Sequence, residues 1–167
     1  MIKSDIDTRL ALLELEDTFA KSWDSGDAER HASLYTDNGI LEMEAAGPLP
    51  ANTIHGRKTL GDFCLKNSRN YPGLHMLDIS SFDLRRRGNI ATGSVKFEFC
   101  FFADDTSCDQ NASNDELAMQ PQDSLQHVTG IYHTTYIYSK KQWHIQRRSM
   151  SKIEQSDNGV YNIPSLG

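Results

Sequence analysis

Residues 19–35 read FAKSWDSGDAERHASLY, and this stretch decides how the chain begins to fold. Ser25 and Gly26 break a first helix. Asp27 is a good N-cap for a second helix, because its carboxylate can accept a hydrogen bond from the free N–H groups of the first turn. Asp24 has no capping role, and at the end of the first helix its charge gains nothing from the helix dipole. Asp24 is therefore either a solvated surface acid or a functional one.

Around this turn, the spacing of apolar residues predicts helices first and long strands afterwards. The inward stripe of the first helix, over residues 5–24, comprises Leu12, Leu15, Phe19 and Trp23, widened by Ile6, Leu10 and Leu13. The other expected elements are helix 27–36, a turn at 37–39, strand 40–44, loop 45–54, helix 56–69, and strands 74–86, 90–102, 124–139 and 143–154. This order predicts an α+β fold, in which a cone-shaped, curved, mainly antiparallel sheet packs on three N-terminal helices and encloses a pocket.

The composition of the chain narrows its class. Its 167 residues suit one domain, expected over residues 1–154. Residues 103–122 are acidic and nearly devoid of large apolar groups, so we expect a mobile loop there and a loose polar tail at 155–167. The formal net charge of -6 argues against nucleic-acid binding, because phosphates attract clustered Lys and Arg. No secretory signal or membrane-spanning segment is visible.

The cysteines and histidines show no spacing typical of a metal site. Cys64, Cys100 and Cys108 are odd in number and far apart, which favours reduced thiols in a cytoplasmic protein. Four histidines have no Asp or Glu at a sequence spacing that would indicate a site: His31, His55, His127 and His144. We therefore expect no metal in this protein.

Several short motifs occur in order between residues 8 and 152. They are Trp23-Asp24-Ser25-Gly26-Asp27, Leu34-Tyr35-Thr36-Asp37-Asn38, Ile54-His55-Gly56-Arg57, His75-Met76, Gly130-Ile131-Tyr132-His133 and Trp143-His144-Ile145-Gln146-Arg147-Arg148. Together they resemble the nuclear transport factor 2-like (NTF2-like) superfamily, and within it the SnoaL-like branch of polyketide-cyclase-like and scytalone-dehydratase-like proteins. Motifs of this kind occur in members with unrelated roles, so they imply the fold more than an activity.

The resemblance also implies a pair of catalytic residues. Enzymes of this branch place an Asp and a His face to face in the pocket, and the matching positions here are Asp24 and His75. A carboxylate bonded to one imidazole nitrogen leaves the other nitrogen as a general base near neutral pH. Such a base suits proton abstraction beside a carbonyl or a leaving group, and it needs no cofactor.

Other residues are assigned supporting roles in the same pocket. Arg148 is expected to hold an anionic oxygen or a leaving group, although strand alternation allows Arg147 to point inward instead. His133 is considered as a second proton carrier. The side chains expected to bind substrate are Phe19, Trp23, Tyr35 and Tyr132.

One position departs from the family pattern. Many members carry a Tyr where this chain has Phe19, so a catalytic hydroxyl would have to come from elsewhere, with Tyr35, Tyr132 and Tyr136 as alternatives. Purely structural roles are the alternatives for both residues. Asp24 would then be a solvated acid at the helix end, and the His75 imidazole would form a hydrogen bond with a backbone group.

These observations favour a cofactor-independent lyase or isomerase, such as a dehydratase, acting on a small, apolar, oxygenated ring molecule. The alternative is a noncatalytic ligand-binding or assembly module, like the small subunit of ring-hydroxylating dioxygenases. We expect no nucleic-acid or membrane partner. A homo-oligomer, dimer or trimer, is expected because the apolar face of residues 95–101 and the tyrosine face of residues 132–138 cannot both fill one pocket.

Overall fold

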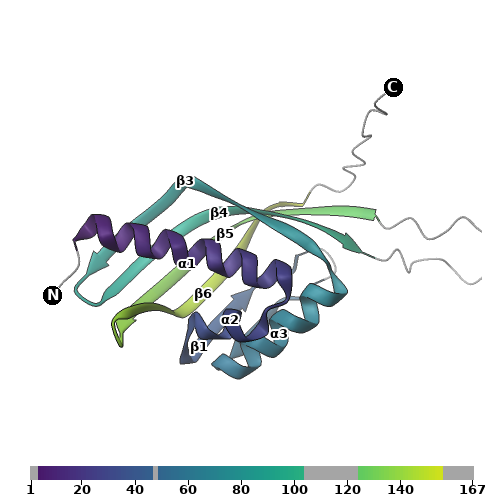
Figure 1. Cartoon of the computed structure of the whole chain (residues 1–167). Helices are drawn as coiled ribbons and strands as arrows, with labels where there is room; N and C mark the ends of the chain where they lie inside the picture. Colours follow the sequence, from purple (N-terminus) through teal and green to yellow (C-terminus); the bar gives the residue numbers. More distant parts are fainter. Residues whose placement is uncertain (1–3, 47–48, 104–123, 156–167) are drawn as a thin grey trace, which may run out of the picture.

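The structure, a computed structural model, describes residues 4–46, 49–103 and 124–155. In this part of the chain three helices lie on one face of a curved six-stranded sheet (Figure 1). The elements are α1 (Asp5–Ser25), α2 (Ala28–Ser33), β1 (Tyr35–Met43), β2 (Asn52–His55), α3 (Arg57–Asn70), β3 (Gly73–Arg87), β4 (Ile90–Ala103), β5 (Ser124–Ser139) and β6 (Gln142–Gln155). The strand order is β2-β1-β6-β5-β4-β3, and only the β1–β6 pair is parallel. The expected α+β architecture is confirmed.

Local hydrogen bonds define both ends of α1. Its first turn is a capping box, in which the Ser4 hydroxyl accepts the Asp7 N–H at 3.1 Å and the Asp7 carboxylate accepts the Ser4 N–H at 3.2 Å. The helix ends at Gly26, whose φ of 68° lies in the left-handed region that favours glycine. The Asp27 carboxylate then accepts the Arg30 N–H at 3.0 Å and caps α2. The helix-turn-helix predicted from residues 19–35 is confirmed.

The inward face of α1 is narrower than predicted. Leu12 and Phe19 are buried against the sheet, whereas Ile6 is 73% exposed and Leu10 is 62% exposed. At roughly 100° per residue, Leu10 lies about 200° around the helix from Leu12. Including Ile6 and Leu10 in the buried stripe was therefore wrong.

The segment after α2 also differs from the prediction. Tyr35, expected in a helix, is the first residue of β1, and Asp37, expected in a turn, lies within the same strand. The Arg57 side chain binds the Tyr35 carbonyl at 2.5 Å and the Asp37 carboxylate at 3.1 Å. These contacts from α3 hold residues of turn-forming type in an irregular strand, whose register against β6 shifts between Tyr35 and Ile40.

The two aromatic faces predicted from β4 and β5 lie on the same side of the sheet. Val95 is the direct partner of Tyr132 in the β4–β5 ladder, and paired residues project from the same face. The rings of Phe97 and Tyr132 stack with centroids 4.1 Å apart. The idea that one of these faces must be left over for a dimer contact was therefore wrong, and homo-oligomerisation stays a prediction without that support.

Within the described residues, none of the helices combines the length and apolar character needed to cross a membrane. The loop expected at 103–122 and the tail expected at 155–167 lie outside the described residues, except that Ala103 ends β4 and Gln155 ends β6.

Candidate active site

Asp24 and His75 meet where the end of α1 crosses the start of β3. Asp24 Oδ1 lies 2.6 Å from His75 Nδ1, and Asp24 Oδ2 accepts the backbone N–H of His75 at 2.9 Å. The side chains are 14% and 4% exposed, respectively. Because an ionised carboxylate only accepts hydrogen bonds, this pairing assigns the proton of a neutral His75 to Nδ1 and leaves Nε2 with a free lone pair.

The second nitrogen of His75 faces a tyrosine from the opposite side of the site. The Tyr132 hydroxyl, on β5, lies 3.2 Å from Nε2 and donates a hydrogen bond to it in this tautomer. Tyr132 is buried, and its ring contacts the Phe19 ring with centroids 5.3 Å apart. Of the three tyrosines considered as a substitute at the Phe19 position, Tyr132 is the one whose hydroxyl reaches the imidazole.

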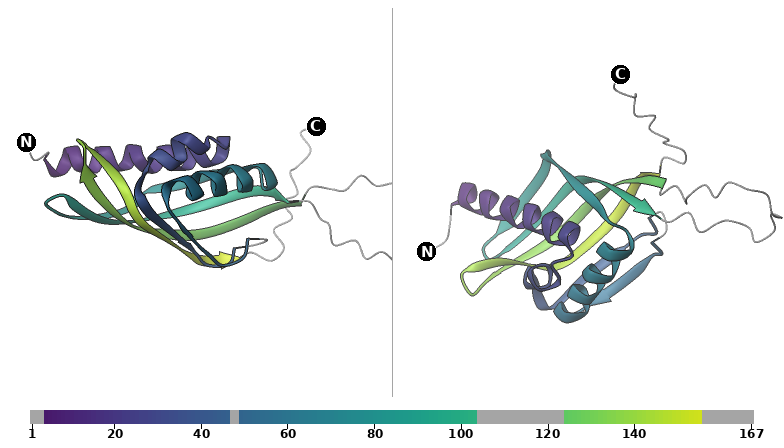
Figure 2. Two further views of the ribbon diagram at one scale, coloured as in Figure 1. Left: turned by 90° about the horizontal axis from the view of Figure 1, so that it is seen from below. Right: turned by 45° about the vertical axis from the view of Figure 1, so that its right-hand side comes forward.

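Aromatic rings hold the imidazole in place. Phe99 stacks on His75 at a centroid distance of 4.3 Å, and Trp23 meets it edge-on at 6.1 Å. Both residues also line an apolar pocket between the helices and the sheet. Figure 2 shows the helices lying along one side of this curved sheet. The imidazole is therefore fixed in orientation within apolar surroundings.

The pocket is small in this structure. It is lined by Phe19, Trp23, Leu41, Met43, Ala46, Leu49, His75, Phe97, Phe99, Phe101, Val128, Tyr132 and Met150. Its cavity volume of about 30 Å³ has room for about two water molecules at most. A ring-sized ligand requires side chains of the wall to move, and the flexible Met43 and Met150 are suited to that. Three of the predicted substrate-binding residues line the pocket, namely Phe19, Trp23 and Tyr132.

Arg148 points inward, but it lies behind the pocket wall. Its guanidinium pairs with Glu16 and donates to Thr134 Oγ1 at 3.0 Å. The guanidinium carbon lies 4.0 Å from the ring centroid of Phe19 and 4.8 Å from that of Tyr132, and the side chain is fully buried. Arg148 is thus separated from the pocket by two lining rings, and the expectation that it contacts a leaving group was wrong for this arrangement.

A β-bulge decides which of the two arginines faces the core. Along the β5–β6 ladder, Tyr136 pairs with Ile145 while the neighbouring Thr135 pairs with Arg147, so Gln146 is an extra residue on β6. The bulge shifts the alternation and turns Arg148 inward. Arg147 lies on the outer face, where it donates to the Glu42 carboxylate at 2.5 and 3.0 Å.

Two other predicted site residues lie away from the pocket. His133 is exposed on the outer face of β5 and pairs across the ladder with Ser94, so its role as a second proton carrier in the pocket was wrong. Adjacent strand residues project to opposite faces, and Tyr132 already occupies the inner one. Tyr35 is fully buried beside His31, with ring centroids 5.8 Å apart, and it does not line the pocket.

The sequence analysis missed Glu16. This fully buried carboxylate pairs with Arg148 and accepts the Tyr136 hydroxyl at 2.6 Å. A signal for it exists in the sequence, because Glu16 follows Leu12 by four residues and so lies on the apolar face of α1. A carboxylate buried in that position destabilises the fold unless a charged or hydrogen-bonding group pairs with it.

His31 forms a second buried polar site beneath the pocket. Its Nδ1 lies 3.0 Å from Ser22 Oγ, and its ring packs against Phe19 at a centroid distance of 4.7 Å. Burial, with a smaller contribution from the positive charge of Arg148, lowers the pKa of His31 from 6.5 to about 3. His31 is therefore neutral at physiological pH.

The comparisons with known proteins agree with this architecture. The sequence profile of the family described as "SnoaL-like domain" matches residues 4–149. A search of curated proteins finds no match. The family match therefore covers the residues of the site described above.

Several solved structures superpose on nearly the whole chain. A candidate aromatic ring hydroxylase from Novosphingobium aromaticivorans has a TM-score of 0.71 at 16% identity, covering 91% of this chain and 93% of that one. A candidate scytalone dehydratase from the same organism has a TM-score of 0.68 at 13% identity, with coverages of 93% and 91%. An NTF2-like superfamily protein from Salmonella enterica has a TM-score of 0.69 at 13% identity, with coverages of 94% and 99%. Identities this low establish a shared fold alone.

Proposed function

The chain belongs to the SnoaL-like domain family, and from that premise we propose that it is a cofactor-independent lyase or isomerase. Its substrate would be a small, mostly apolar, oxygenated ring molecule. The observation that carries this proposal is the alignment of Asp24, His75 and Tyr132 along one line of hydrogen bonds at the wall of an apolar pocket. The likeness of the fold to a candidate scytalone dehydratase is consistent with it.

The proposed chemistry begins with proton abstraction by His75 Nε2. A bound substrate would take the place of the Tyr132 hydrogen bond, so that Nε2 faces an acidic C–H beside a carbonyl. The proton moves to Nε2, the electron pair of the C–H bond forms the C=C bond of an enolate, and the π pair of the C=O bond moves onto the oxygen. Asp24 stabilises the resulting imidazolium through Nδ1–H, while the enolate either expels a leaving group or is reprotonated at another carbon.

Tyr132 supplies the hydrogen-bond donor for the developing negative charge on that oxygen. Burial raises the pKa of Tyr132 well above its ordinary value of 10, so the hydroxyl keeps its proton at neutral pH. Placed 3.2 Å from Nε2, the hydroxyl lies close enough for both groups to contact one carbonyl unit of a substrate.

The size of the pocket favours a second candidate, a noncatalytic ligand-binding or assembly module. A cavity of about 30 Å³ holds no ring molecule until its wall opens. If the wall does not open, the Asp24–His75 pair would serve only to join α1 to β3, and the domain would act through its surface.

The test incubates the protein with a panel of hydroxy-ketones in deuterated water. NMR then measures how fast the protons beside each carbonyl are replaced by deuterium. The wild type should exchange the protons beside the carbonyl of at least one compound, and His75→Ala should slow that exchange by about 10²- to 10⁴-fold. His133→Ala is the matched control, because this exposed histidine of the same sheet faces away from the pocket. Exchange that survives in both His75→Ala and Asp24→Asn would remove the pair from the mechanism. Ligand binding without exchange of any compound would favour the module.

A further inference from the structure

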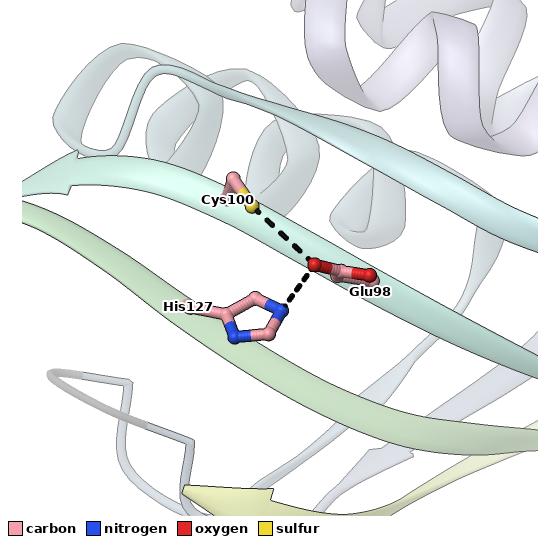
Figure 3. A group of neighbouring side chains, drawn as sticks. All are labelled: Glu98, Cys100 and His127. Atoms are coloured by element: carbon pink, nitrogen blue, oxygen red, sulfur yellow. Dashed lines mark hydrogen bonds and ion pairs between the residues drawn. The ribbon is translucent and has the colours of Figure 1, made fainter. Parts of the chain in front are cut away.

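Another group of polar side chains projects from the outer face of the sheet (Figure 3), whereas Phe97 and Phe99 of β4 line the pocket on the inner face. Glu98 and Cys100 are two residues apart on β4, so their side chains project from the same face. His127 is the direct partner of Cys100 on β5 and projects from that face as well. The ladder thus brings a carboxylate, a thiol and an imidazole to one spot.

The donor atoms of these residues converge. His127 Nε2 lies 2.5 Å from Glu98 Oε1, and Cys100 Sγ lies 3.9 Å from the same oxygen. All three donor atoms lie within 4.8 Å of one another. His127 Nε2 is screened from solvent, and the carboxylate of Glu98 is the group that it faces. The buried nitrogen therefore points to the centre that the three donors share.

We propose that Glu98, Cys100 and His127 form a zinc-binding site. Thiolate, imidazole and carboxylate are the ligand types that Zn²⁺ takes in proteins, and a thiolate disfavours the harder Mg²⁺ and Ca²⁺. With Glu98 and Cys100 deprotonated and His127 neutral, the three ligands balance the charge of the ion. Three protein ligands leave a fourth position for water or for a donor from another molecule.

The side chains are close to the geometry that zinc requires. Tetrahedral zinc with ordinary bond lengths separates a ligating nitrogen and oxygen by about 3.3 Å, and a sulfur and an oxygen by about 3.5 Å. The observed separations of 2.5 and 3.9 Å are corrected by moving Glu98 Oε1 away from His127 and towards Cys100. The Glu98 side chain is 42% exposed, so its rotation meets little resistance.

Apolar side chains flank the Glu98 and Cys100 donors on the outer face of β3 and β4. Leu74 pairs with Cys100, Met76 pairs with Glu98, and Phe102 follows Cys100 by two residues on β4. Each of these three apolar side chains is about half exposed or more. Apolar neighbours lower the local dielectric, which strengthens the attraction between the ligands and the ion.

Sequence spacing does not reveal this group, because 27 residues separate Cys100 and His127 and only strand pairing joins them. Glu98 and Cys100, two residues apart on β4, and their cross-strand neighbour His127 on β5 place three donors on one face of the sheet. The expectation of no metal considered spacing along the chain alone.

The experiment uses the full chain and Co²⁺ as a spectroscopic substitute for zinc. Cobalt should give a thiolate-to-cobalt charge-transfer band and the visible bands of a tetrahedral ion, and zinc should remove both by competition. Cys100→Ser should abolish the charge-transfer band. His127→Ala and Glu98→Gln should each weaken zinc binding by about 100-fold or more, because loss of even an outer-shell partner costs 10- to 100-fold.

Two control variants separate this site from adventitious binding. Cys108→Ser removes a cysteine outside the described residues, and His133→Ala removes an exposed histidine elsewhere on the outer face of the sheet. Both should bind cobalt as the wild type does. A wild-type spectrum without a thiolate band would overturn the proposal, as would a band that survives Cys100→Ser and is lost in Cys108→Ser. Circular dichroism of Cys100→Ser confirms that a lost band does not reflect unfolding.

Discussion

Asp24 and His75 are 51 residues apart in the chain, yet two hydrogen bonds join them, one to the imidazole and one to the backbone N–H. The same carboxylate therefore orients the imidazole and holds the start of β3 against the end of α1. This double use predicts that substitutions of Asp24 and of His75 have different consequences.

We predict that Asp24→Asn lowers turnover by about 10²- to 10⁴-fold and also destabilises the fold. The amide has one acceptor oxygen in place of two, so one of the two N–H groups of His75 loses its partner. A partly buried donor left unsatisfied costs about 1–3 kcal/mol. Urea unfolding and the exchange assay measure the two effects separately. Unchanged stability would contradict the structural part of this prediction.

We predict that Tyr132→Phe lowers kcat by about 10²-fold and changes KM little, because the lost hydrogen bond matters chiefly to the developing oxyanion. The ring that packs on Phe19 and Phe97 is kept, so the fold should persist. Steady-state kinetics on any ketone that the wild type turns over provide the measurement. An unchanged kcat would exclude the hydroxyl from the reaction.

We predict that Arg148→Met costs about 3–5 kcal/mol of unfolding free energy, because Glu16 is then left as an uncompensated buried charge. The double variant with Glu16→Gln should recover much of that loss. The outer pair of Arg147 and Glu42 is the matched control: Arg147→Ala should cost at most about 1 kcal/mol, since solvent screens an exposed pair. Equal losses for the two single arginine variants would argue against this account.

We predict that His31 makes the protein less stable in acid. The pKa of His31 is about 3 in the folded chain and 6.5 as its ordinary value, so the unfolded state binds more protons between these pH values. The contribution of neutral His31 to the free energy of unfolding is therefore fully present above pH 6.5 and is lost as the pH falls towards 3. The loss amounts to at most about 1.4 kcal/mol per pH unit.

Urea unfolding of His31→Gln across that range is the check on this dependence. Its stability should change less steeply with pH than that of the wild type, whereas His55→Gln, at an exposed position, should leave the slope as it is. A slope that is the same in His31→Gln and the wild type would assign the acid sensitivity to other groups.

The sequence predicted the local elements well, because their causes are local. The apolar period of α1, the break at Gly26 and the cap at Asp27 are properties of short segments, and they mark the first helices correctly. The strand boundaries from β3 onward also agree closely with those predicted. One exception is Tyr35 at the start of β1, where Arg57 from α3 binds the backbone. Another is β2 (Asn52–His55), which overlaps the loop expected at 45–54 and forms by pairing with β1.

The helix-turn-helix, the alternation of the long strands and the residue types available for a site follow from short stretches of the chain. Which of these residues meet depends on how the strands pair in three dimensions. The bulge at Gln146 turns Arg148 inward in place of Arg147, strand pairing brings His127 to Cys100, and β5 carries the Tyr132 hydroxyl to His75. The physical reason is that side-chain direction in a strand changes with every residue, so one inserted residue or one choice of register reassigns a whole face.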